Sequence, residues 1–270
     1  MTQSDSSKSL RLECADGGWL HYTSCGEGDP VVFIHGFGLD SGMWDPQWQA
    51  FAQRHRVIRY DLRGYGGSSL PEGTYSHVDD LLALIDFLGA APVHLVGLSL
   101  GGRVALRAAV QEPQAVRSLT LADAALDGHV WTDDWLQRWR RMTETAKRGN
   151  LNEAKKLWRE HILFEPATKN PRVAESLSMM VDRYSGWHLA YPDPGTAPQR
   201  PVAQVLPSIS IPSLVLVGEL DLPDFRAIAR RLGQEMPHAE LQTIAGVGHM
   251  SNMEAPQVFN ELVLGFLRRF

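Results

Sequence analysis

The sequence predicts an α/β fold built on a mostly parallel, doubly wound sheet of eight strands, with a helical insertion. Strand and helix patterns alternate on both sides of one long helical stretch, which is typical of this class. Fully apolar runs such as residues 31–34 suit central parallel strands that are covered on both faces. The 270 residues, 44% of them hydrophobic, allow one large core that carries an insertion.

Eight short segments have the composition and the spacing of strands. The first two read as a β-hairpin that turns at an Asp-Gly-Gly sequence, and the others are apolar runs separated by helical patterns or turn residues. The strands are expected at residues 10–14, 19–24, 31–34, 57–60, 93–96, 119–122, 213–217 and 241–244.

Helical patterns separate most of these strands. One helix is expected to begin after Ser76, which acts as N-cap, and to stop at Gly89. A second begins directly behind the strand at 93–96, with apolar residues at helical spacing. The remaining helices of this kind are expected at residues 43–54, 222–232 and 256–270.

From residue 126 onward the pattern changes to helices without strands. Thr132, Asn150 and Asn170 each precede a helical pattern in the position of an N-cap. This stretch fits an insertion at the carboxyl edge of the sheet, after the sixth strand. The interpretation divides the chain into a core, residues 1–125 and 206–270, and a helical cap, residues 126–205.

Composition and charge limit the classes of partner that the protein is expected to bind. The net charge is -5 and no basic run is long enough to follow a phosphate backbone, so no nucleic acid is expected to bind. Residues 1–8 lack the apolar segment of a signal peptide and predict a frayed terminus. No stretch has the roughly 18 apolar residues of a membrane span. A soluble, cytoplasmic protein is the default expectation, and a homodimer is possible.

The cysteines and histidines indicate neither a disulfide nor a metal site. Cys14 and Cys25 are the only cysteines, and their places in the predicted hairpin keep the two sulfurs from facing each other. Two reduced, partly buried thiols are therefore expected. The ten histidines show no metal-binding spacing. We expect no metal and no cofactor.

Residues 97–101 read Gly-Leu-Ser-Leu-Gly and lie between the predicted strand at 93–96 and the helix behind it. In that setting a Gly-x-Ser-x-Gly sequence forms a nucleophile elbow, a strained turn that pushes the serine hydroxyl out at the sheet's carboxyl edge. The flanking glycines are needed where a Cβ would collide with a neighbouring element. Ser99 is therefore the predicted nucleophile.

A serine nucleophile needs a base to take its proton and an acid to orient that base. On this fold the order along the chain is serine, acid, histidine. His249 follows the last predicted strand and is the predicted base, and Asp221 follows the strand before it and is the predicted acid. Asp224 and Glu219 would need a shifted loop, whereas Asp123, after the sixth strand, is a possible substitute acid.

The negative oxygen of an acyl-transfer intermediate needs two hydrogen-bond donors that already point at it. The backbone N–H of Leu100, directly after Ser99, is the first expected donor. The second is expected from the loop after residues 31–34, at the N–H of Phe37.

These motifs, with the His-Gly-Phe-Gly turn at 35–38, resemble the α/β-hydrolase superfamily, and residues 97–102 resemble its small capped serine esterases and enol-lactonases. The resemblance covers the chain except for the cap. It implies an α/β-hydrolase fold with a structural turn at residues 61–68, in which Arg63 is solvated or ion-paired rather than in contact with substrate. Relatives that open epoxides or displace halide use aspartate as nucleophile, so Ser99 argues against both activities.

The predicted activity is hydrolysis of a small, fairly apolar carboxylic ester through an acyl-enzyme on Ser99. A lactonase of the enol-lactone type and a carbon–carbon bond hydrolase on the same triad stay open, and a non-catalytic ligand receptor is a further alternative. In the cap, the spacing of Trp135 and Trp139 favours packing over ligand contact. Trp187 is the one candidate for substrate binding, and the cap shows no basic cluster directed at one site.

Overall fold

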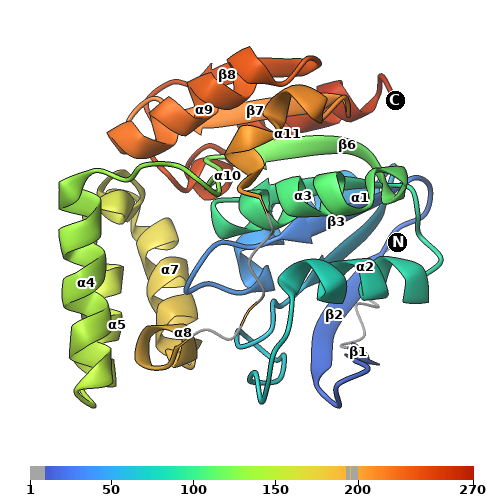
Figure 1. Ribbon diagram of the computed structural model, residues 1–270. Coiled ribbons are helices and arrows are strands. Elements are labelled where there is room, and N and C mark those ends of the chain that lie inside the picture. Colours follow the sequence, from blue (N-terminus) through green and yellow to red (C-terminus); the bar gives the residue numbers. More distant parts are fainter. Residues whose placement is uncertain (1–9, 193–194, 196–199) are drawn as a thin grey trace.

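The computed structural model describes residues 10–192, 195 and 200–270. The predicted frayed terminus and part of the connector that precedes residue 200 lie outside these residues. Eight strands form one sheet in the order β1-β2-β4-β3-β5-β6-β7-β8, which confirms the predicted fold class (Figure 1). The strands are β1 Leu10–Glu13, β2 Trp19–Cys25, β3 Pro30–Ile34, β4 Arg56–Tyr60, β5 Val93–Leu98, β6 Val116–Ala122, β7 Ser213–Gly218 and β8 Ala239–Ile244.

The sheet is parallel from β4 to β8, and only the β1–β2 hairpin and the β2–β4 pair are antiparallel. Every residue of the central strands β5 and β7 is buried. Because both faces of a parallel sheet are covered, these strands are apolar throughout rather than alternating. The carboxyl ends of the parallel strands therefore meet at one edge.

Helices cover both faces of this sheet. The helices α2 and α3 pack together on one face, and α1 and α11 pack together on the other (Figure 1). Ser76 caps α2 as expected, with its hydroxyl accepting a hydrogen bond from the N–H of Asp79 at 3.1 Å. The core helices are α1 Asp45–Ala52, α2 His77–Phe87, α3 Leu100–Gln111, α9 Pro223–Glu235, α10 Ser251–Glu254 and α11 Pro256–Leu267.

A helical segment lies between β6 and β7, beside the sheet (Figure 1), and we call its helices α4 to α8 the cap helices. The predicted N-caps Thr132 and Asn170 each accept a hydrogen bond from a backbone N–H of the helix that follows. Asn150 precedes α5 but makes no such bond. The cap helices are α4 Asp133–Lys147, α5 Leu151–Arg159, α6 Glu165–Thr168, α7 Pro171–Arg183 and α8 Trp187–Ala190.

The structure also bears on the predictions made for the cysteines and for membrane-spanning segments. Cys14 and Cys25 form no disulfide and are both partly buried, as predicted. Within the described residues, no helix combines the length and the apolar composition needed to cross a bilayer.

Candidate active site

Ser99 stands between β5 and α3 with φ 54° and ψ −112°, a conformation that non-glycine residues rarely adopt. Its N–H donates to the carbonyl oxygen of Ala122 at 3.0 Å, which ties the turn to β6. A Cβ on Gly101 would lie 2.0 Å from the carbonyl oxygen of Ile34. The elbow therefore forms only because glycine lets the start of α3 approach β3 so closely.

Asp221 and His249 follow β7 and β8, so both loops leave the same edge of the sheet as Ser99. The Nδ1–H of His249 donates to Oδ2 of Asp221 at 2.9 Å, and both side chains are buried. The N–H of Leu222 donates to the other carboxylate oxygen at 2.7 Å. Ser99 and His249 line one small cavity, so the elbow and the loop after β8 meet there.

Burial lowers the pKa of His249 to about 4. The ring of Phe225 covers the imidazole, with 4.3 Å between the ring centroids. At neutral pH the imidazole is therefore uncharged, which is the form that accepts a proton. The loop is held in place by Glu254, whose carboxylate accepts the N–H groups of Gly248 and Met250 on either side of His249.

Asp123, the alternative acid, is fully buried next to the predicted triad and also has a positive φ of 45°. Its carboxyl accepts the N–H of Gly218 at 2.8 Å and the hydroxyl of Ser251 at 2.5 Å. Burial and the neighbouring charge of Asp221 raise the pKa of Asp123 well above its usual range. Two buried carboxyls side by side cannot both ionise, so we assign the proton to Asp123 and the charge to Asp221, which bonds His249.

The other two acids near this position have partners elsewhere. Asp224 accepts hydrogen bonds from the N–H and the hydroxyl of Thr132 at the start of the cap, at 3.0 and 2.6 Å. Glu219 accepts the N–H of Gly246 at 2.8 Å. Each of them therefore stabilises a loop rather than the imidazole.

Asp123, Asp221 and His249 have possible metal-ligand atoms within 4.8 Å of one another, and no other group of this kind occurs in the described part of the chain. The protein already uses these atoms, because Asp221 accepts from His249 and Leu222, and Asp123 accepts from Gly218 and Ser251. The arrangement suits proton handling better than metal coordination.

The two expected oxyanion donors lie near the nucleophile. Leu100 is the first residue of α3, and the N–H groups of a helix's first turn have no acceptor within the helix. Phe37 follows Gly36, and both line the small cavity with Ser99. Sequence reasoning missed the residue that positions this turn, which is the buried His35. Its Nδ1–H donates to the carbonyl of Gly36 at 2.8 Å, and its Nε2 accepts the N–H of Leu62 at 2.9 Å.

The turn at residues 61–68 is a structural support. The carboxylate of Asp61 accepts the N–H groups of Ser41 and Gly67, both at 2.8 Å. Arg63 is buried and ion-paired, donating to Asp80 at 2.6 and 3.0 Å and to Asp16 at 2.5 Å. It does not line the cavity, which agrees with the ion-paired interpretation.

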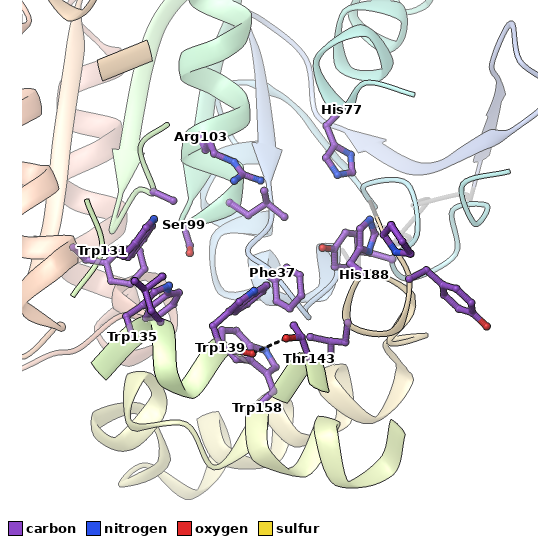
Figure 2. Close-up of a pocket in the computed structure, with 18 of the residues that line it drawn as sticks. Phe37, His77, Ser99, Arg103, Trp131, Trp135, Trp139, Thr143, Trp158 and His188 are labelled. Atoms are coloured by element: carbon purple, nitrogen blue, oxygen red, sulfur yellow. Dashed lines mark hydrogen bonds between the residues drawn. The ribbon is translucent and has the colours of Figure 1, made fainter. Parts of the chain in front are cut away.

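A larger cavity of about 550 Å³ lies between Ser99 and the cap (Figure 2). One wall is a stripe along α4 in which every fourth residue faces the cavity. The spacing of four residues keeps these side chains on one helix face. Trp135 and Trp139, for which the sequence favoured packing, both line the cavity and also pack against the rings of Phe225 and Trp158. The stripe consists of Trp135, Trp139, Thr143 and Lys147, and Trp131, which precedes α4, lines the cavity beside it.

The structure does not bring Trp187 to the cavity lining. Its ring contacts those of His188 and Tyr191, at centroid distances of 5.0 and 5.8 Å, and these two residues line the cavity instead. Two basic residues line the cavity, Arg103 from the core helix α3 and Lys147 from the cap helix α4. Arg103 could have been found, since it follows Ser99 by one turn of a predicted helix.

The model of the alpha/beta hydrolase family matches residues 31–262. The chain belongs to this family. It is 27% identical over 241 residues to 3-oxoadipate enol-lactonase 1 of Acinetobacter baylyi, covering 88% of each chain. It is 29% identical over 259 residues to a putative carbamate hydrolase of Azorhizobium caulinodans, covering 92% of this chain and 94% of the relative.

The solved structure of a thermophilic esterase from Thermogutta terrifontis superposes with a TM-score of 0.84 at 27% identity. The match covers 97% of this chain and 99% of the esterase. The similarity therefore extends across both the sheet and the cap helices. Family membership and these relatives show that the protein is a hydrolase of the alpha/beta type.

Proposed function

We propose that the protein is a serine hydrolase of carboxylic esters that acts through an acyl-enzyme on Ser99. The observation that carries this proposal is the hydrogen bond from His249 to Asp221, at 2.9 Å, beside the strained elbow that presents Ser99. An uncharged imidazole oriented by a carboxylate is the arrangement that activates a serine hydroxyl.

In this mechanism Oγ of Ser99 attacks the ester carbonyl carbon while Nε2 of His249 accepts the hydroxyl proton. Asp221 stabilises the resulting imidazolium through its bond to Nδ1–H. The N–H groups of Phe37 and Leu100 donate to the oxygen that becomes negative. His249 then returns the proton to the leaving alcohol, and water activated by the same imidazole cleaves the acyl-enzyme.

Lactone hydrolysis is the second candidate function. It uses the same steps on a cyclic ester, except that the leaving alcohol stays attached to the acyl group. The similarity to an enol-lactonase favours it specifically. A small lactone would fit the cavity of about 550 Å³ as readily as an open ester.

Fluorophosphonate labelling combined with a substrate panel tests the proposal. The unmodified protein is expected to be labelled at Ser99, and Ser99→Ala and His249→Ala are expected to abolish labelling. Ser208→Ala, at an exposed serine far from the elbow in sequence, is the matched control and keeps full labelling. Turnover of p-nitrophenyl acyl esters, lactones and vinylogous diketones then separates ester, lactone and carbon–carbon bond hydrolysis.

A folded, unmodified protein that is not labelled would contradict the proposal and favour a non-catalytic receptor. Labelling at a serine other than Ser99 would contradict the assignment of the nucleophile. Circular dichroism of each variant identifies any loss of labelling that comes from misfolding.

A further inference from the structure

We propose that the site selects esters whose acyl half is no larger than an acetyl group and whose alcohol half is aromatic. The inference deepens the proposed function in its ester form and rests on it, because it takes Ser99 as the nucleophile. It assigns the acyl half to the small cavity beside His249 and the alcohol half to the large cavity between Ser99 and the cap.

Ser99 lies where the two cavities meet, because it lines both of them. Phe37 and Trp158 also line both, so their side chains separate the small cavity from the large one. The two rings meet edge to face, with 5.4 Å between the centroids and an interplanar angle of 88°. A Cβ on Gly38 would lie 2.4 Å from Nε1 of Trp158, so this close packing of the indole depends on glycine. A substrate bound at Ser99 therefore extends into two separate spaces.

The small cavity has room for one methyl-sized group. Its volume is about 10 Å³, close to the roughly 10–15 Å³ that a single water molecule requires. A longer chain would have to displace closely packed side chains, which costs free energy. Six of the side chains that line this cavity are at most 3% exposed: Leu39, Leu98, Trp158, Leu163, Phe164 and Met250. The cavity is therefore closed to solvent on the side formed by these residues.

The large cavity differs in size, in access and in composition. Its volume is about 550 Å³, and it reaches the surface at Leu136 and Tyr191, which are 43% and 59% exposed. Figure 2 shows Trp135 and Trp139 along one side of it, and their rings are nearly parallel, with an interplanar angle of 13°. Flat aromatic groups pack well against indole rings. An aromatic half of the substrate therefore fits this cavity and does not fit the small one.

The order of events at the serine decides which half lies in which cavity. The acyl group stays bonded to Oγ of Ser99 while the alcohol departs and water enters. Departure and entry need a route to solvent, and the large cavity provides one. The acyl half needs no route of its own until the second step, and acetate is small enough to leave past Ser99. The closed cavity therefore suits the acyl half.

A pair of isomeric esters tests this assignment without any variant. Phenethyl acetate and methyl 3-phenylpropanoate have the same formula, but the ester is reversed, so the aromatic ring lies on the alcohol side in the first and on the acyl side in the second. Both release a simple primary alcohol, so their chemical reactivity is similar. The unmodified protein is expected to give a kcat/KM about 10- to 100-fold higher for phenethyl acetate, because the other isomer would overfill the small cavity.

A series of p-nitrophenyl esters measures the size of the acyl pocket. After correction for spontaneous hydrolysis, kcat/KM is expected to fall about 10- to 100-fold from the acetate to the butyrate, and further to the octanoate. Leu163→Ala enlarges the small cavity from the cap side and should raise the ratio of butyrate to acetate about tenfold. Leu136→Ala, the same substitution in the large cavity, is the control and should leave this ratio unchanged.

Leu163 is 2% exposed, so its truncation to alanine can also destabilise the cap. Circular dichroism and thermal unfolding identify that outcome. Leu163→Val removes less volume and should shift the ratio in the same direction by a smaller factor, which keeps the test available if the alanine variant does not fold.

Three results would overturn the inference. They are equal kcat/KM for the acetate and the butyrate, a preference for methyl 3-phenylpropanoate over phenethyl acetate, and an unchanged ratio in folded variants at Leu163. Any of these with Ser99 still labelled by fluorophosphonate leaves the proposed function standing, whereas absence of labelling overturns that function itself.

Discussion

The core and the cap contribute to the candidate site in different ways. The core supplies reactive groups whose positions depend on backbone geometry. The turn at Ser99 is an example, because it needs a glycine at position 101, where a Cβ would lie 2.0 Å from the carbonyl oxygen of Ile34. The cap supplies one face of a helix, where Trp135 and Trp139 are stacked at 6.3 Å. The chemistry of the candidate site therefore depends on local turns of the core, whereas the shape of its cavity depends on how α4 docks on that core.

The two regions are also held by different forces. Buried ion pairs such as Arg63 with Asp80 stabilise the turns of the core. Exposed or small polar contacts join the cap to the core: Arg183, 57% exposed, pairs with Asp40, and the hydroxyl of Thr132 donates to Asp224. Aromatic packing around Phe37 adds to its docking, because the ring of Phe37 contacts Trp139, Trp158 and Tyr184 at 5.0 to 5.7 Å.

The largest expected effect lies in the core, at the paired acids. Asp221→Asn should lower kcat about 10⁴-fold with little change in KM, because an amide cannot stabilise the imidazolium. Asp123→Asn should lower kcat less than about tenfold, because its carboxyl already carries a proton and an amide of the same shape replaces it. Steady-state kinetics on one neutral ester measure both variants.

If Asp123→Asn lowered kcat more than Asp221→Asn does, Asp123 would be the acid of the triad. Equal losses would show that the two carboxyls act as one unit, as expected for groups that share a proton. Thermal unfolding of both variants separates these outcomes from loss of the fold.

An effect of intermediate size is expected for two tryptophans, Trp44 in the core and Trp139 in the cap. Trp44 is fully buried against Phe33 in the core, at a centroid distance of 4.8 Å, so Trp44→Ala should lower the free energy of unfolding by about 3–5 kcal/mol. Trp139 is partly buried and lines the cavity, so Trp139→Ala should cost less stability but raise KM for aryl esters about tenfold. Denaturant unfolding and steady-state kinetics measure the two effects.

The distinction between core and cap would fail if Trp139→Ala lost stability as Trp44→Ala does while KM stayed constant. In that case the tryptophans of α4 serve for packing, as their spacing in the sequence suggested.

The smallest expected effect is a change in pH dependence. Only uncharged His249 accepts the serine proton, so kcat/KM falls as the pH falls through its pKa. Because burial lowers that pKa to about 4, from the usual 6.5, the rate should stay level down to about pH 5. Phe225→Ala removes the ring that covers the imidazole and should move the acid limb toward pH 6.5.

An acid limb near pH 6.5 in the unmodified protein would contradict this assignment of the charge on His249. Assays returned to neutral pH after each acid exposure distinguish protonation from irreversible unfolding.

Much of the core could be predicted because its signals are local. Apolar runs of four to six residues identified the strands, and the glycines around Ser99 identified the elbow, since few other sequences tolerate that turn. The order of Ser99, Asp221 and His249 along the chain indicated which loops share an edge of the sheet. Asn150 shows the limit of such signals, because it occupies a cap position without making the capping bond.

The residues around the site could not be predicted in the same way. Helical spacing shows that Trp135, Trp139 and Lys147 share a face, but not whether that face meets the core or a cavity. The prediction that Trp187 lines the site was wrong for the same reason. Its neighbours His188 and Tyr191 line the cavity, whereas Trp187 does not.

By itself the sequence determined the sheet, the helical insertion and the three residues of the predicted triad, because short-range sterics and hydrogen bonds govern these features. Only the tertiary structure decided that Asp123 lies beside Asp221, and that Arg103 and the stripe on α4 enclose one cavity. Those relations join segments far apart in the chain, and the packing of whole elements determines them.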